Sequence, residues 1–193
     1  METKSILLVG VGGQGTILAA KMLTIGLMES GCDVKMSEIH GMSQRGGSVS
    51  SHVRYGSKVL SPVIEKGGAD VIVSFEQMEA MRNLPYLKKD GIVIVADSKI
   101  PGLPVMLGKA PYPDGIISSL KEKCRTISFD AYNEAEKLGT PKCMNVILLG
   151  STVKIMGLEH IDWHDIISKN VKPQFVDLNL KAFDLGLKLA EER

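Results

Sequence analysis

The chain has 193 residues, of which 44% are hydrophobic and 23% charged, and its 23 lysines and arginines nearly balance 22 aspartates and glutamates. A chain of this length buries roughly 70% of the surface that it exposes when unfolded, so we expect one domain over residues 1–193 with a sizeable core. The formal net charge of +1 and the 5% aromatic content argue against a nucleic-acid partner, which usually requires a basic excess and aromatic stacking.

The N-terminal segment predicts a strand, a glycine-rich turn and a helix. Ile6 to Val9 is a continuous apolar run, typical of a strand buried on both faces of a parallel sheet, and glycines follow it too soon for a signal peptide. Thr16 to Ser30 has apolar residues at helical spacing, and Gly31 ends this helix. With a second strand over Asp33 to Ser37, the pattern predicts a βαβ unit with a right-handed crossover.

The middle of the chain predicts three further strands. Ser48 to Tyr55 alternates small polar and apolar residues, which indicates a strand at the edge or in a mixed part of the sheet. Val71 to Ser74 and Ile92 to Ala96 are buried strands, with a short helix from Glu76 to Arg82 between them. Four prolines between Ile100 and Pro113 predict a loop or an extended crossing.

The C-terminal part predicts two short elements and then long helices. Asp114 to Lys123 and Ala131 to Leu138 have helical patterns around a short strand, Thr126 to Phe129. Cys143 to Met156 is apolar nearly all round, so it is buried either in the core or against another chain, and the two apolar rows after Phe175 leave the same choice. The whole pattern predicts an α/β, Rossmann-like three-layer fold with a mostly parallel sheet and C-terminal helices.

Cysteine number and hydropathy exclude other classes of protein. Cys32, Cys124 and Cys143 are odd in number and widely spaced, which is typical of reduced thiols in a cytoplasmic protein. No Cys-x-x-Cys pair is present, so we expect no iron–sulfur cluster on this chain. The chain contains no stretch of about 18 apolar residues, so we expect no membrane span.

A first candidate site is the motif Gly10-Val11-Gly12-Gly13-Gln14-Gly15, a G-x-G-x-x-G between a strand and a helix. Such glycines allow a tight turn and close approach of a pyrophosphate, and the helix N-terminus attracts an anion. Glu38 follows the motif near the position of an acid that binds the ribose of NAD. The alternative is that the glycines only permit the turn.

A second candidate site is the loop Glu38 to Gly47, EIHGMSQRGG, from which Ser43, Gln44, Arg45, Gly46 and Gly47 are predicted binding residues. Polar, flexible loops after strands hold ligands in open α/β sheets, and the planar fork of Arg45 suits a phosphate or carboxylate. The alternative is a surface loop with a solvated arginine. Two further residues have two possible roles each. Glu76 is either a site residue or a helix stabiliser, and Asn145 is either a structural or a site residue.

Several separated motifs resemble one family. VGVGGQGTILAAKML, SEIHGMSQRGGSVSSHVRYG, VIVSFEQMEAMR and MNVILLGS keep the order found in the small, gamma-type component of 2-oxoacid:ferredoxin oxidoreductases, and most resemble the indolepyruvate type. The resemblance covers nearly the whole chain and is least diagnostic after about Gly157.

The resemblance implies a subunit that is inactive alone and supports oxidative decarboxylation of aryl 2-oxoacids to acyl-coenzyme A, with electrons passing to ferredoxin. It implies that thiamine diphosphate, Mg²⁺ and 4Fe-4S clusters belong to a large subunit, so this chain alone binds no cofactor and helps to hold the co-substrate coenzyme A. Self-association of the isolated chain is also expected. Two alternatives remain: a stand-alone NAD-dependent Rossmann oxidoreductase and a regulatory module that senses a nucleotide or coenzyme A.

Overall fold

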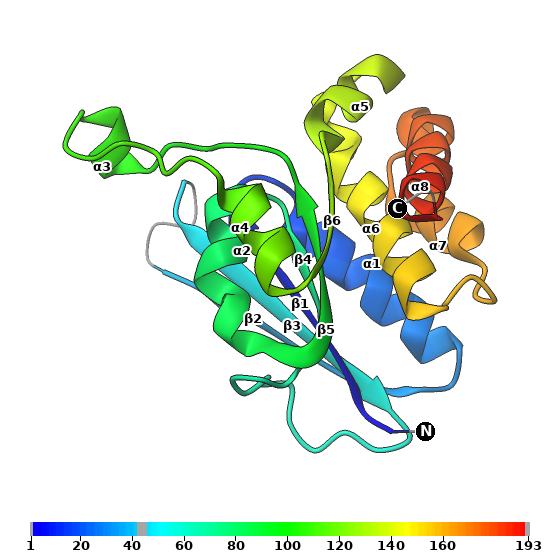
Figure 1. Ribbon diagram of the computed structural model, residues 1–193. Helices are drawn as coiled ribbons and strands as arrows, with labels where there is room; N and C mark the ends of the chain where they lie inside the picture. The colour runs from blue at the N-terminus through cyan, green and yellow to red at the C-terminus, as the bar shows by residue number, and fades with distance from the viewer. Residues whose placement is uncertain (1, 42–45, 192–193) are drawn as a thin grey trace.

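The computed structural model describes residues 2–41 and 46–191, whose strands form one six-stranded sheet in the order β2-β3-β1-β4-β5-β6 (Figure 1). Four neighbouring strands are parallel: β1 (Lys4–Val11), β4 (Ala69–Ser74), β5 (Leu87–Ala96) and β6 (Arg125–Phe129). Their apolar runs match burial on both faces. The fold class predicted from the sequence is therefore confirmed.

The other side of the sheet is an antiparallel extension. β2 (Asp33–His40) pairs with β3 (Ser48–Gly56), and β3 pairs antiparallel with β1. The predicted mixed part of the sheet is thus correct for Ser48 to Tyr55. The simple βαβ unit is wrong in one respect, because β3 lies between β1 and β2 and the two strands are not neighbours. Strand periodicity carries no information about which strand pairs with which.

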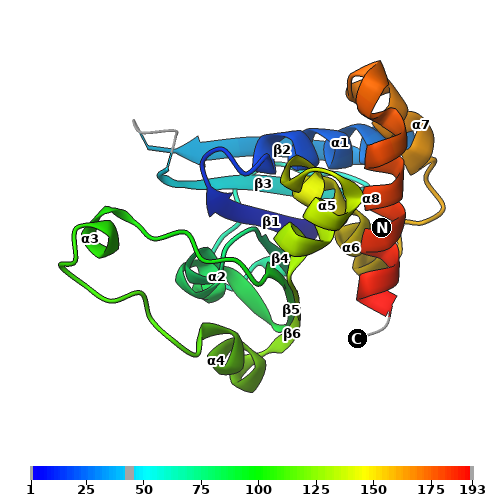
Figure 2. The same cartoon turned by 90° about the horizontal axis from the view of Figure 1, so that it is seen from above.

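Helices cover both faces of the sheet, as the views in Figures 1 and 2 show. Ile6 and Leu8 of β1 face one apolar core, and Leu7 and Val9 face the other, because side chains alternate along a strand. The first core is covered by α1 (Thr16–Glu29), α5 (Ala131–Leu138), α6 (Met144–Met156), α7 (Trp163–Asn170) and α8 (Val176–Glu191). The second is covered by α2 (Gln77–Asn83) and α4 (Ile116–Lys123).

The apolar helix α6 lies within the core of this chain. Its residues Met144 to Val153 are all buried, packed between the sheet, α1 and α8. A Cβ at Gly150 would come 2.2 Å from the carbonyl oxygen of Phe183, and one at Gly186 would come 2.0 Å from that of Ile147. Of the two possibilities for this segment, the core is correct, and the helix is no argument for a partner interface.

The chain between β5 and α4 extends away from the sheet and carries the short helix α3 (Leu103–Met106) (Figures 1 and 2). The predicted loop over residues 100–113 is thus correct apart from this single helical turn. The described residues also contain three short 3-10 helices: Leu84–Tyr86, Pro141–Cys143 and Pro173–Phe175. Within the described residues, no helix is both long and apolar enough to cross a membrane.

Candidate functional site

The glycine turn joins the carboxyl end of β1 to α1. Gly13 and Gly15 have φ of 108° and 84°, which side chains other than glycine disfavour. The side chain of Gln14 braces the turn, because its Oε1 accepts from the amide of Val11 at 2.8 Å and its Nε2 donates to the carbonyl of Phe75 at 2.7 Å. Gln14 therefore ties the end of β1 to the end of β4.

Two glycines of the motif have different surroundings. A Cβ on Gly10 would come 2.9 Å from both Gln14 Oε1 and the Cβ of Phe75, so a small residue is needed for packing. A Cβ on Gly13 would meet nothing within 4 Å, so this side of the turn is open. Gly10 and Gln14 thus shape the turn, while Gly13 presents its backbone outward.

The structure brings the two predicted glycine-rich segments together. The amide of Gly12 donates to the carbonyl of Gly47 at 2.8 Å, and the amide of Gly46 donates to the carbonyl of Gly12 at 3.2 Å. The predicted residues Ser43, Gln44 and Arg45 lie outside the described residues.

The glycine turn lies where the chain leaves two neighbouring strands, β1 and β4, toward opposite faces of the sheet. α1, after β1, packs on one face, and α2, after the neighbouring β4, packs on the other. Ligands of open α/β sheets bind at such a point, outside the carboxyl ends of the strands. α1 begins after Gly15 with no side chain capping its N-terminus, so its first amides and dipole are available to an anion.

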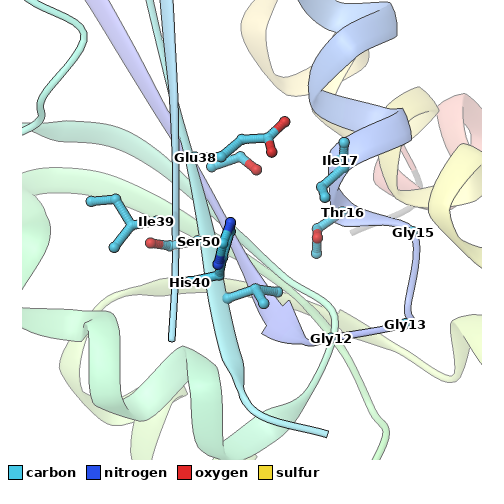
Figure 3. Close-up of a pocket in the computed structure, with 11 residues that line it drawn as sticks. Gly12, Gly13, Gly15, Thr16, Ile17, Glu38, Ile39, His40 and Ser50 are labelled. Atoms are coloured by element: carbon cyan, nitrogen blue, oxygen red, sulfur yellow. The ribbon is translucent and has the colours of Figure 1, made fainter. Parts of the chain in front are cut away.

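One cavity beside the turn contains an acid, and we name it the Glu38 cavity. It has a volume of about 320 Å³ and is bounded by Gly12, Gly13, the start of α1, and Glu38 and His40 of β2. Figure 3 shows Glu38 pointing toward Ile17 at the start of α1. The acid expected near the motif therefore does lie beside it, which suits a hydroxyl donor and disfavours a phosphate.

A second cavity borders the other side of the same turn, and we name it the lysine cavity. It has a volume of about 660 Å³ and is lined by Gly13, Gly15, Lys99, Lys142 and Tyr132, among others. Lys142 and the uncapped helix end favour an anion, and Lys99, whose Nζ lies 3.5 Å from the carboxylate of Asp114, adds a second lysine to the lining. Sequence reasoning missed both lysines. Lys99 could have been found from its place just after β5, whereas Lys142 precedes a helix and carries no such signal.

Asn145 supports the turn from α6. It is 4% exposed, and its Nδ2 donates to the carbonyl of Gly15 at 3.3 Å. A Cβ on Gly15 would come 2.7 Å from this nitrogen, so the contact also requires glycine at position 15. Asn145, in an otherwise apolar helix, is thus a buried polar residue that satisfies the backbone of the candidate site.

Glu76 is a buried structural acid. It is 1% exposed and caps α2 by accepting from the amide of Glu79 at 2.9 Å. It also accepts from the amide of Ile100 at 3.2 Å and from the Tyr112 hydroxyl. Burial, followed by this bond to Glu76, raises the pKa of Tyr112 well above its usual range, so the phenol stays protonated. The helix-stabilising interpretation of Glu76 therefore accounts for its contacts.

The described residues contain no group of three or more histidine, cysteine, aspartate or glutamate side chains that could hold a metal ion. His164 lies 2.8 Å from the carboxylate of Asp184 and joins α7 to α8.

The fold and the glycine turn define the class: an α/β protein of Rossmann-like architecture with a glycine-rich turn and an uncapped helix start at the carboxyl edge of its sheet. The sequence model of the pyruvate ferredoxin/flavodoxin oxidoreductase family matches residues 5–189, and the chain belongs to this family.

Named relatives make the similarity more specific. The chain is 40% identical over 200 residues to the indolepyruvate oxidoreductase subunit IorB of Pyrococcus horikoshii, covering 100% of this chain and 98% of the relative. It is 40% identical over 189 residues to the subunit of the same name from Archaeoglobus fulgidus, covering 94% and 92%.

Solved structures share the fold at lower identity. The gamma subunit of a keto/oxoacid ferredoxin oxidoreductase from Geobacter sulfurreducens matches with a TM-score of 0.74 and 23% identity, over 98% of this chain and 99% of that one. A 2-oxoglutarate:ferredoxin oxidoreductase from Magnetococcus marinus, solved with 2-oxoglutarate, coenzyme A and succinyl-CoA bound, matches with a TM-score of 0.77 and 19% identity. The match covers all of this chain but only 32% of that longer chain.

Proposed function

We propose that this chain is the small subunit of an indolepyruvate:ferredoxin oxidoreductase. The observation that carries the proposal is full-length identity of about 40% to two subunits of indolepyruvate oxidoreductases. The enzyme would convert an aryl 2-oxoacid and coenzyme A into carbon dioxide and an acyl-coenzyme A, and the electrons released would reduce ferredoxin. Thiamine diphosphate, Mg²⁺ and 4Fe-4S clusters would belong to the large subunit and supply the carbon and electron chemistry.

We assign to this chain a part of the coenzyme A site. Coenzyme A carries several phosphate groups, and the lysine cavity joins Lys99, Lys142 and the start of α1 at the carboxyl edge of the sheet. Gly13 and Gly15 would approach the phosphates, and Arg45 would add a bidentate cation from the neighbouring loop. The remaining predicted residues would shape this part of the coenzyme A site. Gly10, Gly12 and Gln14 hold the turn, Gly46 and Gly47 bond to Gly12, and Ser43 and Gln44 are proposed as further binding residues from the sequence.

The charge of the two cavities supports this placement. A carboxylate at Glu38 would repel a phosphate, whereas two lysines would attract one. Glu38 could accept hydrogen bonds from the hydroxyls of a ribose placed beside the glycine turn. An NAD-dependent enzyme would use an acid at this position in that way. The named relatives support the subunit proposal over the NAD-dependent enzyme. NAD binding by the small chain is therefore measured as one outcome of the experiment below.

We further propose that residues 1–193 act as one gamma-type domain in the cytoplasm. A single sheet contains all six strands of the described residues, and Cys32, Cys124 and Cys143 are free, as is usual in a reducing compartment.

The decisive experiment is co-expression with the candidate large subunit and an anaerobic assay with indolepyruvate and coenzyme A, following reduction of ferredoxin or a viologen dye. We expect activity only when both chains are present. A pair that forms a stable complex without activity, together with NAD binding by the small chain alone, would contradict the proposal. Isothermal titration of the small chain with NAD and with coenzyme A provides that second reading.

A further inference from the structure

Residues 98–115 form a projection that we name the arm. It leaves the carboxyl end of β5, carries α3 at its tip and returns at α4, and both views show it extending away from the sheet and its helices (Figures 1 and 2). Three large apolar side chains gather at the tip: Leu103 is 67% exposed, Met106 73% and Leu107 58%. A cluster of exposed apolar side chains marks an interaction site more often than single ones do.

The base of the arm is held firmly. The amide of Ile100 on the outgoing leg and the hydroxyl of Tyr112 on the returning leg donate to the same oxygen of Glu76, which is buried. Lys99 and Asp114 add an ion pair between the legs, with 3.5 Å from nitrogen to oxygen. One buried carboxylate therefore fixes both legs to α2.

The tip also has an ordered backbone. The amide of Met106 donates to the carbonyl of Gly102 at 3.0 Å, that of Leu107 to Leu103 at 3.0 Å, and that of Lys109 to Pro104 at 2.8 Å. A proline within the turn lowers the conformational freedom of the chain further. An arm that is ordered before binding loses less entropy when it docks.

We propose that the arm is a docking element that inserts its tip, Leu103, Met106 and Leu107, into an apolar groove of the large subunit. This inference rests on the proposed function for the existence of that subunit. The side chains at the tip make a compact apolar anchor of the kind that dominates binding energy at the centre of an interface.

Two observations favour the large subunit over a second copy of this chain. The same tip paired with itself would join only three apolar side chains from each copy, against roughly 20–30 residues a side in a standard interface, whereas a groove can enclose the tip and both legs. The outgoing leg also lines the lysine cavity through Ser98, Lys99 and Ile100. A subunit that grips the arm would therefore be held beside the proposed coenzyme A site, where its thiamine chemistry is needed.

A third observation comes from the Magnetococcus marinus enzyme. The part that matches this chain is 32% of a longer polypeptide, so in that enzyme the matching fold is covalently continuous with the remaining 68% of the chain. A separate chain of the same fold needs non-covalent contacts in place of that continuity.

The test measures binding between the purified small and large subunits by biolayer interferometry. The variant Leu103→Ser, Met106→Ser, Leu107→Ser should weaken binding by about 100-fold or more, as expected when an apolar anchor is lost. The control variant Met28→Ser, Leu60→Ser, Val63→Ser removes three apolar side chains of similar exposure, 60%, 87% and 53%, from other surfaces. It should leave the affinity within about twofold of wild type, which is the scale of ordinary surface substitutions. Both variants should keep the circular dichroism spectrum and melting temperature of the wild-type chain.

Hydrogen exchange gives a reading that needs no variant, because the amides of residue 103 and residues 105–109 should exchange more slowly in the complex than in the free chain. Wild-type affinity in the arm variant, with unchanged exchange at the tip, would overturn the proposal. So would an isolated wild-type chain that is dimeric by light scattering and becomes monomeric in the arm variant, because the occupant would then be a second copy. Enzyme activity of the wild-type pair is measured separately, so failure of the arm and failure of the proposed function give different results.

Discussion

The side-chain amide of Asn145 donates to the backbone carbonyl of Gly15, 130 positions earlier in the chain, across 3.3 Å. This bond joins the first turn of α6 to the start of α1, so the helix that forms the core also positions the glycine turn. Asn145→Ala should lower the free energy of unfolding by about 1–2 kcal/mol.

The same variant tests a positioning role for Asn145. If the bond holds the turn for coenzyme A, the Michaelis constant for coenzyme A should rise several-fold while that for the oxoacid stays near the wild-type value. Asn83→Ala is the matched control, because Asn83 donates a bond of 2.9 Å to the carbonyl of Glu79 on α2 and does not contact the turn. Equal effects of both variants on the Michaelis constant would leave Asn145 with a structural role only.

Lys142 should contribute to phosphate binding. Lys142→Gln removes one ammonium group from the lysine cavity and should weaken coenzyme A binding by roughly tenfold at low salt, because a charge-assisted contact contributes about 1.5 kcal/mol. The loss should shrink as ionic strength rises, since salt screens exposed charges. Lys181→Gln on the exposed surface of α8 makes the same change in net charge elsewhere. A titration in which both variants bind equally well would place the phosphates outside this cavity.

The contact between α6 and α8 should tolerate no added methyl group. The Cβ added by Gly186→Ala would lie 2.0 Å from the carbonyl oxygen of Ile147, which is far inside van der Waals contact, so the helices must move apart. We expect a loss of roughly 3 kcal/mol in the free energy of unfolding. Gly102→Ala, whose added Cβ would meet its nearest heavy atom at 3.9 Å, should change stability by less than about 0.5 kcal/mol. Urea unfolding of the two variants decides the point, and equal midpoints would contradict it.

His52 should make stability depend on pH. It is 4% exposed, its Nδ1 accepts from the amide of Ile64 at 3.1 Å, and burial lowers its pKa below the usual 6.5. As pH falls, the unfolded chain therefore takes up the proton before the folded chain does. The free energy of unfolding should decrease from about pH 6.5, the unfolded pKa, down to the lower folded value.

The variant His52→Asn keeps an acceptor but cannot titrate. Urea unfolding between pH 5 and 8, a range chosen around the histidine pKa of about 6.5, should show a shallower slope in stability for the variant than for the wild-type chain. Parallel slopes would mean that another group causes the pH dependence.

Much of the fold could be predicted because local patterns carry it. Ile6 to Val9 predicted a strand buried on both faces, and Cys143 to Met156 predicted a buried helix. In each run, apolar side chains lie on nearly all sides of the element, so little of its surface suits contact with water. Neither pattern identifies what covers it. For α6 the covering element is α8 of the same chain, and Gly150 and Gly186 permit that contact only when both helices are in place.

The sequence by itself determined the α/β class, the glycine turn and the family, because each depends on residues that are close together or on motifs in a set order. Only the tertiary structure decided that β3 separates β1 from β2, that Glu76 anchors the arm, and that Lys99 and Lys142 share a cavity with Gly13 and Gly15. These relationships join positions far apart in the chain. They depend on strand order and helix packing, which are set by the summed burial of the whole core.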